Sequence, residues 1–301
     1  MLPVHGRYDF SPIDERPHYA WPEGRTLAFY IGVNIEHYAF LRGGGMDPHN
    51  RGSGPTHRNY SWRDYGNRVG VWRVFDLLDA LQLPATVMLN GLVAEHYPQI
   101  MRRLAARHDE ICGHGVTNSQ TLRDVAEADE AGIIRETTRL IEQYTGKRPQ
   151  GWLGPGATSN AVTPDLLKEN GYRYVLDWPA DDQPFWMATR AGPILSVPYP
   201  MEMNDAGAQV LRDHTGRELC DMIVDQFEEM LEQSERQPLV FSLALHGFIV
   251  GQPHRMRNLR RALQHCLQPK YRERLWVTRA GAIADHCMSL APGVVPGDAR
   301  T

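Results

Sequence analysis

The chain has 301 residues, 42% of them hydrophobic and 23% charged, which is ample material for one large globular domain. Its formal net charge of -4 at pH 7 gives no electrostatic basis for binding nucleic acid or an anionic membrane. No stretch approaches the ~18 apolar residues of a transmembrane helix, and the N-terminus lacks the basic and then apolar pattern of a signal peptide. We therefore expect a cytoplasmic protein that acts on a small molecule.

Strand and helix patterns alternate from about residue 27 onward. In the first half, strand patterns lie at 27–36, 85–89 and near Ile111, and amphipathic helix patterns lie at 69–81 and 98–107. Between the first strand and the first helix, residues 43–56 are dense in Gly, Pro and His. So long a loop is typically functional, and we expect it to act as a lid.

The second half continues the alternation. Helix patterns occur at 124–144, from 163, at 217–232 and at 256–267, and strand patterns occur from 148 and at 172–176, 195–198, 239–245 and 275–277. Repeated β then α over ~250 residues, with no GxGxxG or Walker signature, predicts a parallel β/α barrel rather than a nucleotide-binding sheet. We expect an N-terminal arm over 1–26, one barrel domain over 27–290 and a tail over 291–301.

Four cysteines are spread along the chain without a CxxC pair: Cys112, Cys220, Cys266 and Cys287. This spacing indicates neither a zinc ribbon nor a disulfide scaffold, so we expect reduced thiols.

Polar residues at predicted strand ends are the candidates for function, because functional groups gather at the carboxyl ends of parallel strands. Alternation along the first strand puts Asn34 and Glu36 on the same side, where a carboxylate could be a general base or a metal ligand. The alternative is a strand-end glutamate in a salt bridge, with His37 capping a loop.

Two histidines end later strands. His114 lies in a Gly-His-Gly turn with Asn118 one turn further on, so an imidazole nitrogen and an amide oxygen could meet at one point. A His-x-x-x-His pair would indicate a metal more strongly, and Asn118 could simply be a hydrogen-bonding turn residue. His246 ends a buried strand, and a histidine there has a titratable role more often than a surface histidine does.

Aromatic rings follow two further strands. They could stack on a flat substrate near the barrel mouth, although isolated aromatic residues are usually core. The residues in question are Trp152 in a Gly-rich strand exit, and the run that contains Asp177, Trp178, Asp181, Asp182, Phe185 and Trp186. The sequence does not distinguish which of the three aspartates lines the site.

In this order and spacing, the motifs resemble those of the polysaccharide deacetylase (NodB homology) superfamily. They are Asn34-Ile-Glu-His37, Gly113-His-Gly115, Trp152-Leu-Gly-Pro-Gly156, Asp177-Trp178 and Leu245-His246. The resemblance is strongest to a cytoplasmic branch of metal-free allantoinases, cyclic imide hydrolases and a peptidoglycan deacetylase-like group, and it covers nearly the whole chain. It implies an irregular, seven-stranded (β/α)7 barrel and self-association as a homodimer or homotetramer.

The chain departs from the family pattern at three positions. In the metal-dependent members an Asp is the general base, a second Asp and two His hold the metal, and a later His is the acid. Here Asn34 stands at the base position, Glu36 at the ligand Asp and Asn118 at the second His, so that only His114 and His246 keep their types. An amide cannot take a proton at neutral pH, so Asn34 cannot replace the base.

The resemblance therefore leaves two mechanisms open. In one, Glu36, His114 and Asn118 bind a divalent ion, most simply zinc, and His246 protonates the leaving nitrogen. In the other there is no cofactor, Glu36 activates water, and His114 and His246 supply the electrophilic and acid functions. Loss of the Asp base and of one His ligand favours the second mechanism.

The predicted function is ring-opening hydrolysis of a small cyclic amide, imide or ureide, with Glu36, His114 and His246 as catalytic residues. A metal-dependent N-deacetylase and a degenerate barrel that binds ligand without turnover are the alternatives. The residues expected to contact substrate are Asn34, His37, Asn118, Trp152, Asp177, Trp178, Phe185 and Trp186.

Overall fold

A computed structural model of the chain describes residues 5–43 and 55–298. Within them, nine strands form one sheet in the order β6-β7-β5-β4-β3-β2-β1-β8, and β9 pairs with β1 outside this path. The strands are β1 (Leu27–Ile35), β2 (Thr86–Leu89), β3 (Glu110–Gly113), β4 (Gly151–Trp152), β5 (Tyr174–Val175), β6 (Phe185–Met187), β7 (Ile194–Ser196), β8 (Leu239–His246) and β9 (Leu275–Thr278).

The sheet curls into an irregular barrel. All described strand pairs are parallel except β6 with β7. Between β8 and the segments around β6 and β7 the ring closes through single contacts rather than a ladder. Val240 N–H donates to the Asp182 carbonyl at 2.9 Å, and Asn204 forms an isolated parallel bridge with Ala244. The predicted (β/α)7 type of barrel is confirmed, and its irregularity lies at this seam.

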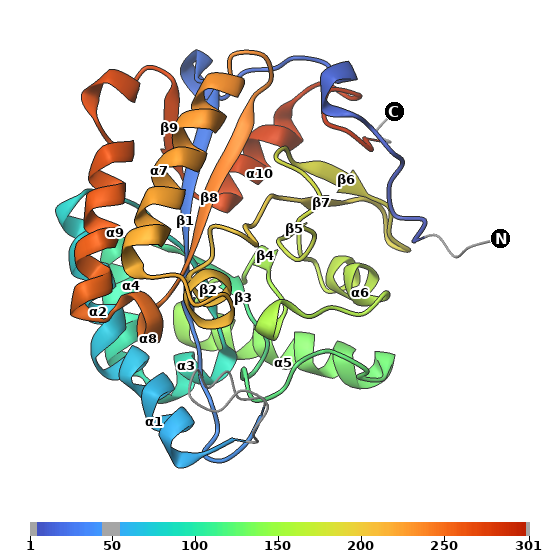
Figure 1. Cartoon of the computed structure of the whole chain (residues 1–301). Coiled ribbons are helices and arrows are strands. Elements are labelled where there is room, and N and C mark those ends of the chain that lie inside the picture. The colour runs from blue at the N-terminus through green and yellow to red at the C-terminus, as the bar shows by residue number, and fades with distance from the viewer. Residues whose placement is uncertain (1–4, 44–54, 299–301) are drawn as a thin grey trace.

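The helices surround the sheet (Figure 1). Figure 1 shows α2, α7 and α9 beside β1 and β8, and α5 and α6 beside β3, β4 and β5. The α-helices are α1 (His57–Tyr65), α2 (Val71–Ala80), α3 (Gly91–His96), α4 (Pro98–Arg107), α5 (Glu127–Thr145), α6 (Thr163–Glu169), α7 (Gly216–Gln233), α8 (Gly247–Val250), α9 (Pro253–Cys266) and α10 (Ala280–Ser289). None of the helices found among residues 5–43 and 55–298 is long and apolar enough to cross a membrane.

Strands β1 and β8 form the centre of the barrel. Every residue of both strands is buried, because helices cover one face and the barrel interior covers the other. They pair in register over eight residues, from Leu27 with Leu239 to Asn34 with His246. This register brings the ends of the two strands together, so that Glu36 and His246 emerge at the same edge of the sheet.

The predicted elements with strong hydrophobic periodicity are present, and the polar ones were missed. Helix α4 spans the predicted residues, whereas α1 was not predicted because its residues are mostly polar and only Asn59 and Arg63 are buried. Strand β6 was not predicted, because its pairing with β7 is not visible in the local sequence. The expected loop at 43–56 falls mostly on 44–54, outside the described residues.

The residues before β1 lie against the outside of the barrel. Arg7 and Arg16 form ion pairs with Asp165 and Asp181, at 2.5 and 2.6 Å. The Ala188 N–H also donates to the Arg7 carbonyl at 2.7 Å. Strand β1 begins at Leu27 and α10 ends at Ser289, while the division into arm, domain and tail stays a prediction.

Candidate active site

A cavity of about 410 Å³ opens at the carboxyl ends of the strands. Its size suits a small-molecule site. Six of the residues predicted to act on or bind substrate line it: Asn34, Glu36, His114, Asn118, Asp177 and His246. They come from the ends of β1, β3, β5 and β8 and the turn after β3, so the barrel brings together residues as far as 212 positions apart in the chain.

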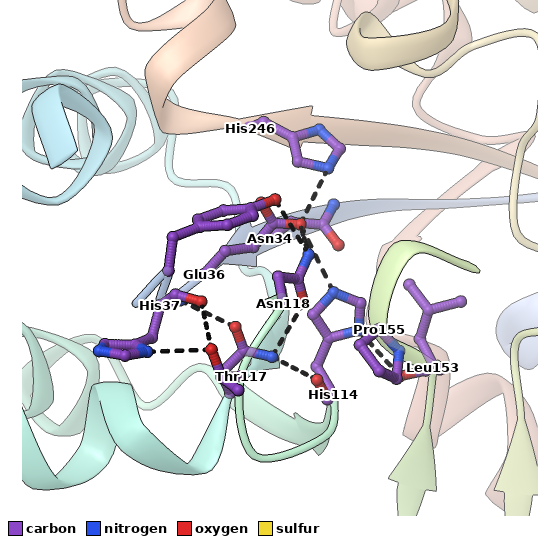
Figure 2. Close-up of polar contacts among 12 residues, drawn as sticks. Asn34, Glu36, His37, His114, Thr117, Asn118, Leu153, Pro155 and His246 are labelled. Carbon is purple, nitrogen blue, oxygen red and sulfur yellow. Dashed lines mark hydrogen bonds and ion pairs between the residues drawn. The ribbon is translucent and has the colours of Figure 1, made fainter. Parts of the chain in front are cut away.

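Glu36 lies at the centre of this group (Figure 2). Its Oε1 atom is 3.6 Å from Nε2 of His114 and 3.6 Å from Nε2 of His246, and Figure 2 shows the two imidazoles approaching it from different strands. These distances are too long for a direct hydrogen bond. They leave room for a water oxygen that lies ~2.8 Å from both the carboxylate oxygen and an imidazole nitrogen. The carboxylate also accepts hydrogen bonds from Asn118 Nδ2 at 2.5 Å and from the Tyr38 hydroxyl at 2.8 Å.

The tautomer of His114 is fixed by its backbone partner. Its Nδ1–H donates to the Leu153 carbonyl at 2.8 Å, because a carbonyl can only accept. The buried Nε2 atom has no hydrogen-bond partner among the described residues and faces Glu36. Gly115 makes this turn possible, since its φ is +71° and a Cβ there would lie 2.8 Å from Pro155.

His246 is paired with a buried acid that the sequence did not indicate. Its Nδ1–H donates to Asp205 Oδ1 at 2.6 Å, and its backbone N–H donates to Asp205 Oδ2 at 2.8 Å. Asp205 lies in an irregular segment after β7 that has no periodicity, and only the general preference for acids near strand ends could have suggested it. The pair leaves Nε2 of His246 directed at Glu36 and the cavity.

A chain of three residues fixes which atom Asn118 presents to Glu36. The His37 backbone N–H donates to Asn90 Oδ1 at 2.8 Å, so the Asn90 amide nitrogen must face the other way. That nitrogen donates to Asn118 Oδ1 at 3.0 Å and to the His114 carbonyl. Asn118 therefore turns its NH2 group toward Glu36 and acts as a hydrogen-bond donor. Asn90 was missed in the sequence, although it directly follows β2 at the same edge.

Asn34 and His37 have structural partners. Asn34 Nδ2 donates to the Tyr199 hydroxyl at 2.8 Å, which fixes the amide beside Glu36. His37 does not line the cavity: its Nδ1 lies 3.0 Å from the Thr117 hydroxyl, and its ring faces His96. The expectation that His37 contacts substrate is corrected, because strand alternation turns it away from Glu36.

The carboxyl group of Glu36 is held in its ionised form. Burial alone would raise its pKa, but the nearby imidazole of His114 and the charges of His246 and Arg63 lower the pKa to about 2. Burial, and after it the charge of Glu36, raises the pKa of Tyr38, so its phenol stays a hydrogen-bond donor. The site therefore holds a fixed negative charge at neutral pH.

The depressed pKa predicts a specific dependence of stability on pH. A carboxyl whose pKa falls from 4.5 to about 2 on folding contributes about 3 kcal/mol of stability above pH 4.5, and loses it as the pH falls toward 2. Between pH 7 and pH 3, the free energy of unfolding of the wild type should fall by about 2 kcal/mol more than that of Glu36→Gln. Urea titrations at the two pH values measure this difference. Glu232→Gln, on the exposed face of α7, is the control and should follow the wild type.

The residues at this site do not fit a three-ligand metal centre. The described part of the chain contains no group of three or more His, Cys, Asp or Glu side chains placed to hold a metal ion. Asn118 was the third expected ligand, but it directs its nitrogen at Glu36 and its oxygen at Asn90. An amide nitrogen that donates to a carboxylate has no lone pair for a cation. The ligand set of Glu36, His114 and Asn118 is therefore corrected.

The aromatic residues expected at the barrel mouth do not line the cavity. Trp152 is fully buried against Tyr172, because Gly113 leaves room for its ring behind the sheet. Trp186 belongs to the core. Trp178 and Phe185 pack on Tyr8 from the N-terminal segment. The stacking role predicted for the four rings is wrong, and the rings at the cavity are Tyr38, Tyr199 and Phe248 instead.

Of the three candidate aspartates, Asp177 lines the cavity. Its Oδ1 accepts the Gly154 N–H at 2.7 Å, and burial raises its pKa to about 7 against the opposing effects of Gly154, His114 and Ser159. Gly154 must be glycine there, since a Cβ would lie 2.0 Å from the Thr158 carbonyl oxygen. Asp181 pairs with Arg16 and lines a neighbouring cavity with Asp182.

Known proteins similar to this chain include polysaccharide deacetylases and an allantoinase. The family model for polysaccharide deacetylase matches residues 57–175. The crystal structure of PuuE allantoinase superposes with a TM-score of 0.81 and is 27% identical, covering 92% of this chain and 97% of that one.

Two further relatives come from bacteria. A structure from Pseudomonas aeruginosa PAO1, described as a probable polysaccharide deacetylase, has a TM-score of 0.78 and 27% identity and covers 90% of this chain and 93% of that one. The peptidoglycan deacetylase of Helicobacter pylori strain 26695 is 26% identical over 110 residues, which are 36% of this chain and 37% of that protein.

Proposed function

We propose that this chain, which is similar to polysaccharide deacetylases over residues 57–175 and to PuuE allantoinase over nearly its whole length, opens a small cyclic amide, imide or ureide by hydrolysing a ring carbon–nitrogen bond. It is an amidohydrolase. The observation that carries the finer proposal is the position of Glu36 Oε1, 3.6 Å from Nε2 of both His114 and His246 inside a cavity of about 410 Å³. The likeness to PuuE allantoinase over nearly the whole chain supports a ring substrate.

Glu36 is assigned the activation of water. A water oxygen that contacts Glu36 Oε1 attacks the ring carbonyl carbon and gives its proton to the carboxylate. With a pKa of about 2, Glu36 is ionised at neutral pH but is a weak base. Loss of the proton from His246 during the reaction removes one of the charges that depress this pKa, so the carboxylate becomes more basic as the bond breaks.

His246 is assigned the protonation of the leaving ring nitrogen. Burial would lower its pKa, but the charge and hydrogen bond of Asp205 and the charge of Glu36 raise it above the usual value. The imidazolium of His246 is therefore favoured more than that of an ordinary histidine. Its Nδ1–H stays on Asp205 while Nε2 gives up a proton to the nitrogen, which completes the cleavage of the bond.

His114 is assigned the carbonyl oxygen. Because Nδ1 donates to the Leu153 carbonyl, Nε2 can donate to a substrate oxygen when the ring is an imidazolium. In that form it would stabilise the negative charge that develops on the oxygen as water adds. Asn118 and Tyr38 keep Glu36 in position between the two histidines and do not themselves transfer protons.

We also propose a small neutral molecule as the partner and the cytoplasm as the location. All four cysteines are free and buried, which supports reduced thiols. Removal of an N-acyl group from a sugar, as the name of the H. pylori relative suggests, remains the alternative function.

A substrate panel separates these functions. Purified protein is incubated with hydantoin, allantoin, a cyclic imide such as succinimide, and N-acetylglucosamine, and products are followed by mass spectrometry. Ring opening adds one water to a cyclic substrate, whereas deacetylation releases acetate. Addition of water to at least one ring substrate supports the proposal. Acetate release alone would favour the deacetylase, and no turnover of any substrate would favour a barrel that only binds ligand.

A further inference from the structure

The rim of the active-site cavity carries two exposed apolar side chains. Among the described residues, six large hydrophobic side chains are exposed, and two of them, Met201 at 63% and Leu211 at 57%, line this cavity. Single exposed hydrophobic residues on a surface need no explanation, but a pair at the mouth of a binding site marks a contact for a ligand.

The segments that carry these two residues are held together. Met201 follows β7, and Leu211 ends a helical turn at Ala206–Leu211. Glu202 and Arg212, their immediate neighbours, form a bidentate ion pair with one contact of 2.8 Å. A Cβ on Gly207 would lie 3.1 Å from the Met201 carbonyl oxygen, so the two segments are also in close backbone contact. These contacts hold the apolar rim formed by Met201 and Leu211 in place.

The charges in the cavity define what else the ligand must be. The described lining residues include the carboxyl groups of Glu36 and Asp177 and no lysine or arginine. A ligand with a carboxylate or phosphate would therefore lack a permanently cationic partner and would lie beside the ionised carboxylate of Glu36. The inner wall below the rim adds Leu153, Leu176 and Phe248, which continue the apolar surface toward the histidines.

We propose that the substrate is a neutral ring compound with an apolar substituent, and that Met201 and Leu211 bind this substituent while Glu36 and the histidines face the ring. This inference rests on the proposed ring-opening function and deepens it. An apolar substituent would distinguish this substrate from unsubstituted ureides. It would also distinguish it from sugars, because sugar hydroxyl groups would lack hydrogen-bond partners against Met201 and Leu211.

The experiment measures binding separately from turnover. Isothermal titration calorimetry on Glu36→Gln protein compares hydantoin with 5-butylhydantoin. A buried methylene group strengthens binding by up to about fourfold, so a partly covered butyl group should lower Kd by about tenfold or more, with a more negative heat-capacity change. Met201→Ser combined with Leu211→Ser should reduce this ratio to about twofold. Phe10→Ser, at a side chain that is 92% exposed and outside the cavity, should leave it unchanged.

Equal Kd values for the two hydantoins, no measurable binding of either, or an unchanged ratio in the double variant would overturn the inference. Hydrolysis by the wild-type protein is assayed in parallel and reports on the proposed function alone. Graded binding without ring opening would keep the apolar subsite and reject ring-opening hydrolysis. Ring opening together with equal Kd values for the two hydantoins would keep ring-opening hydrolysis and reject the apolar subsite.

Discussion

Replacement of Glu36 by Gln is expected to lower kcat by about 10²–10⁴-fold while the protein stays folded. Gln has the same shape, but it cannot take a proton from water, and it removes the negative charge that lies 3.6 Å from both imidazoles. Steady-state kinetics on the ring substrate identified by the panel, with circular dichroism as a check on folding, measures this effect.

The matched control for this variant is Glu232→Gln, which makes the same change on the exposed face of α7 and should keep wild-type kinetics. A Glu36→Gln protein with kcat within threefold of the wild type would show that another group activates the water. The nearest candidate would then be Nε2 of His114, which is the other buried atom directed at the same place.

Replacement of Asp205 by Asn is expected to shift the pH profile as well as the rate. Asp205 raises the pKa of His246, so the acid form should be lost only as the pH rises through a value above 6.5. With a neutral amide at position 205, this pKa falls, and the alkaline limb of kcat should move to lower pH. We also expect kcat at neutral pH to fall by about 10–10³-fold, and His246→Ala to lose about 10²–10⁴-fold at neutral pH and to lack this alkaline limb.

A comparison of three proteins keeps this prediction specific to His246. The pH dependence of kcat is recorded for the wild type, Asp205→Asn and Asp225→Asn, where Asp225 is an exposed residue of α7 that should have no effect on the limb. A lower rate with an unmoved alkaline limb would mean that Asp205 supports the fold of the site but does not set the protonation of His246.

Position relative to strand ends made the catalytic group predictable from sequence. Glu36, His114 and His246 each lie at the end of a strand, and parallel strands must bring their carboxyl ends together. The long apolar runs of β1 and β8 and the helix at Pro98–Arg107 were equally accessible, because their periodicity is local. Strand β6 was not, because it depends on a neighbouring strand that no local pattern specifies.

Side-chain partners were less predictable than positions. Asp205 reaches His246 across 41 residues from an irregular segment, and no spacing rule connects them. The orientation of Asn118 depends on Asn90 and on a backbone N–H, so its residue type alone wrongly suggested a ligand oxygen. Trp152 shows the same limit, since a ring after a strand can turn into the core as readily as into a cavity.

The role of Glu36 is best tested by the metal content of active, untagged protein, measured by elemental mass spectrometry, with activity recorded before and after dialysis against a chelator. Because Asn118 offers Glu36 a hydrogen-bond donor in place of a ligand, we predict far less than one divalent ion per chain and unchanged ring-opening activity after dialysis. About one zinc or similar ion per chain, lost together with activity on dialysis and restored with it, would contradict the assignment of Glu36 as the group that activates water.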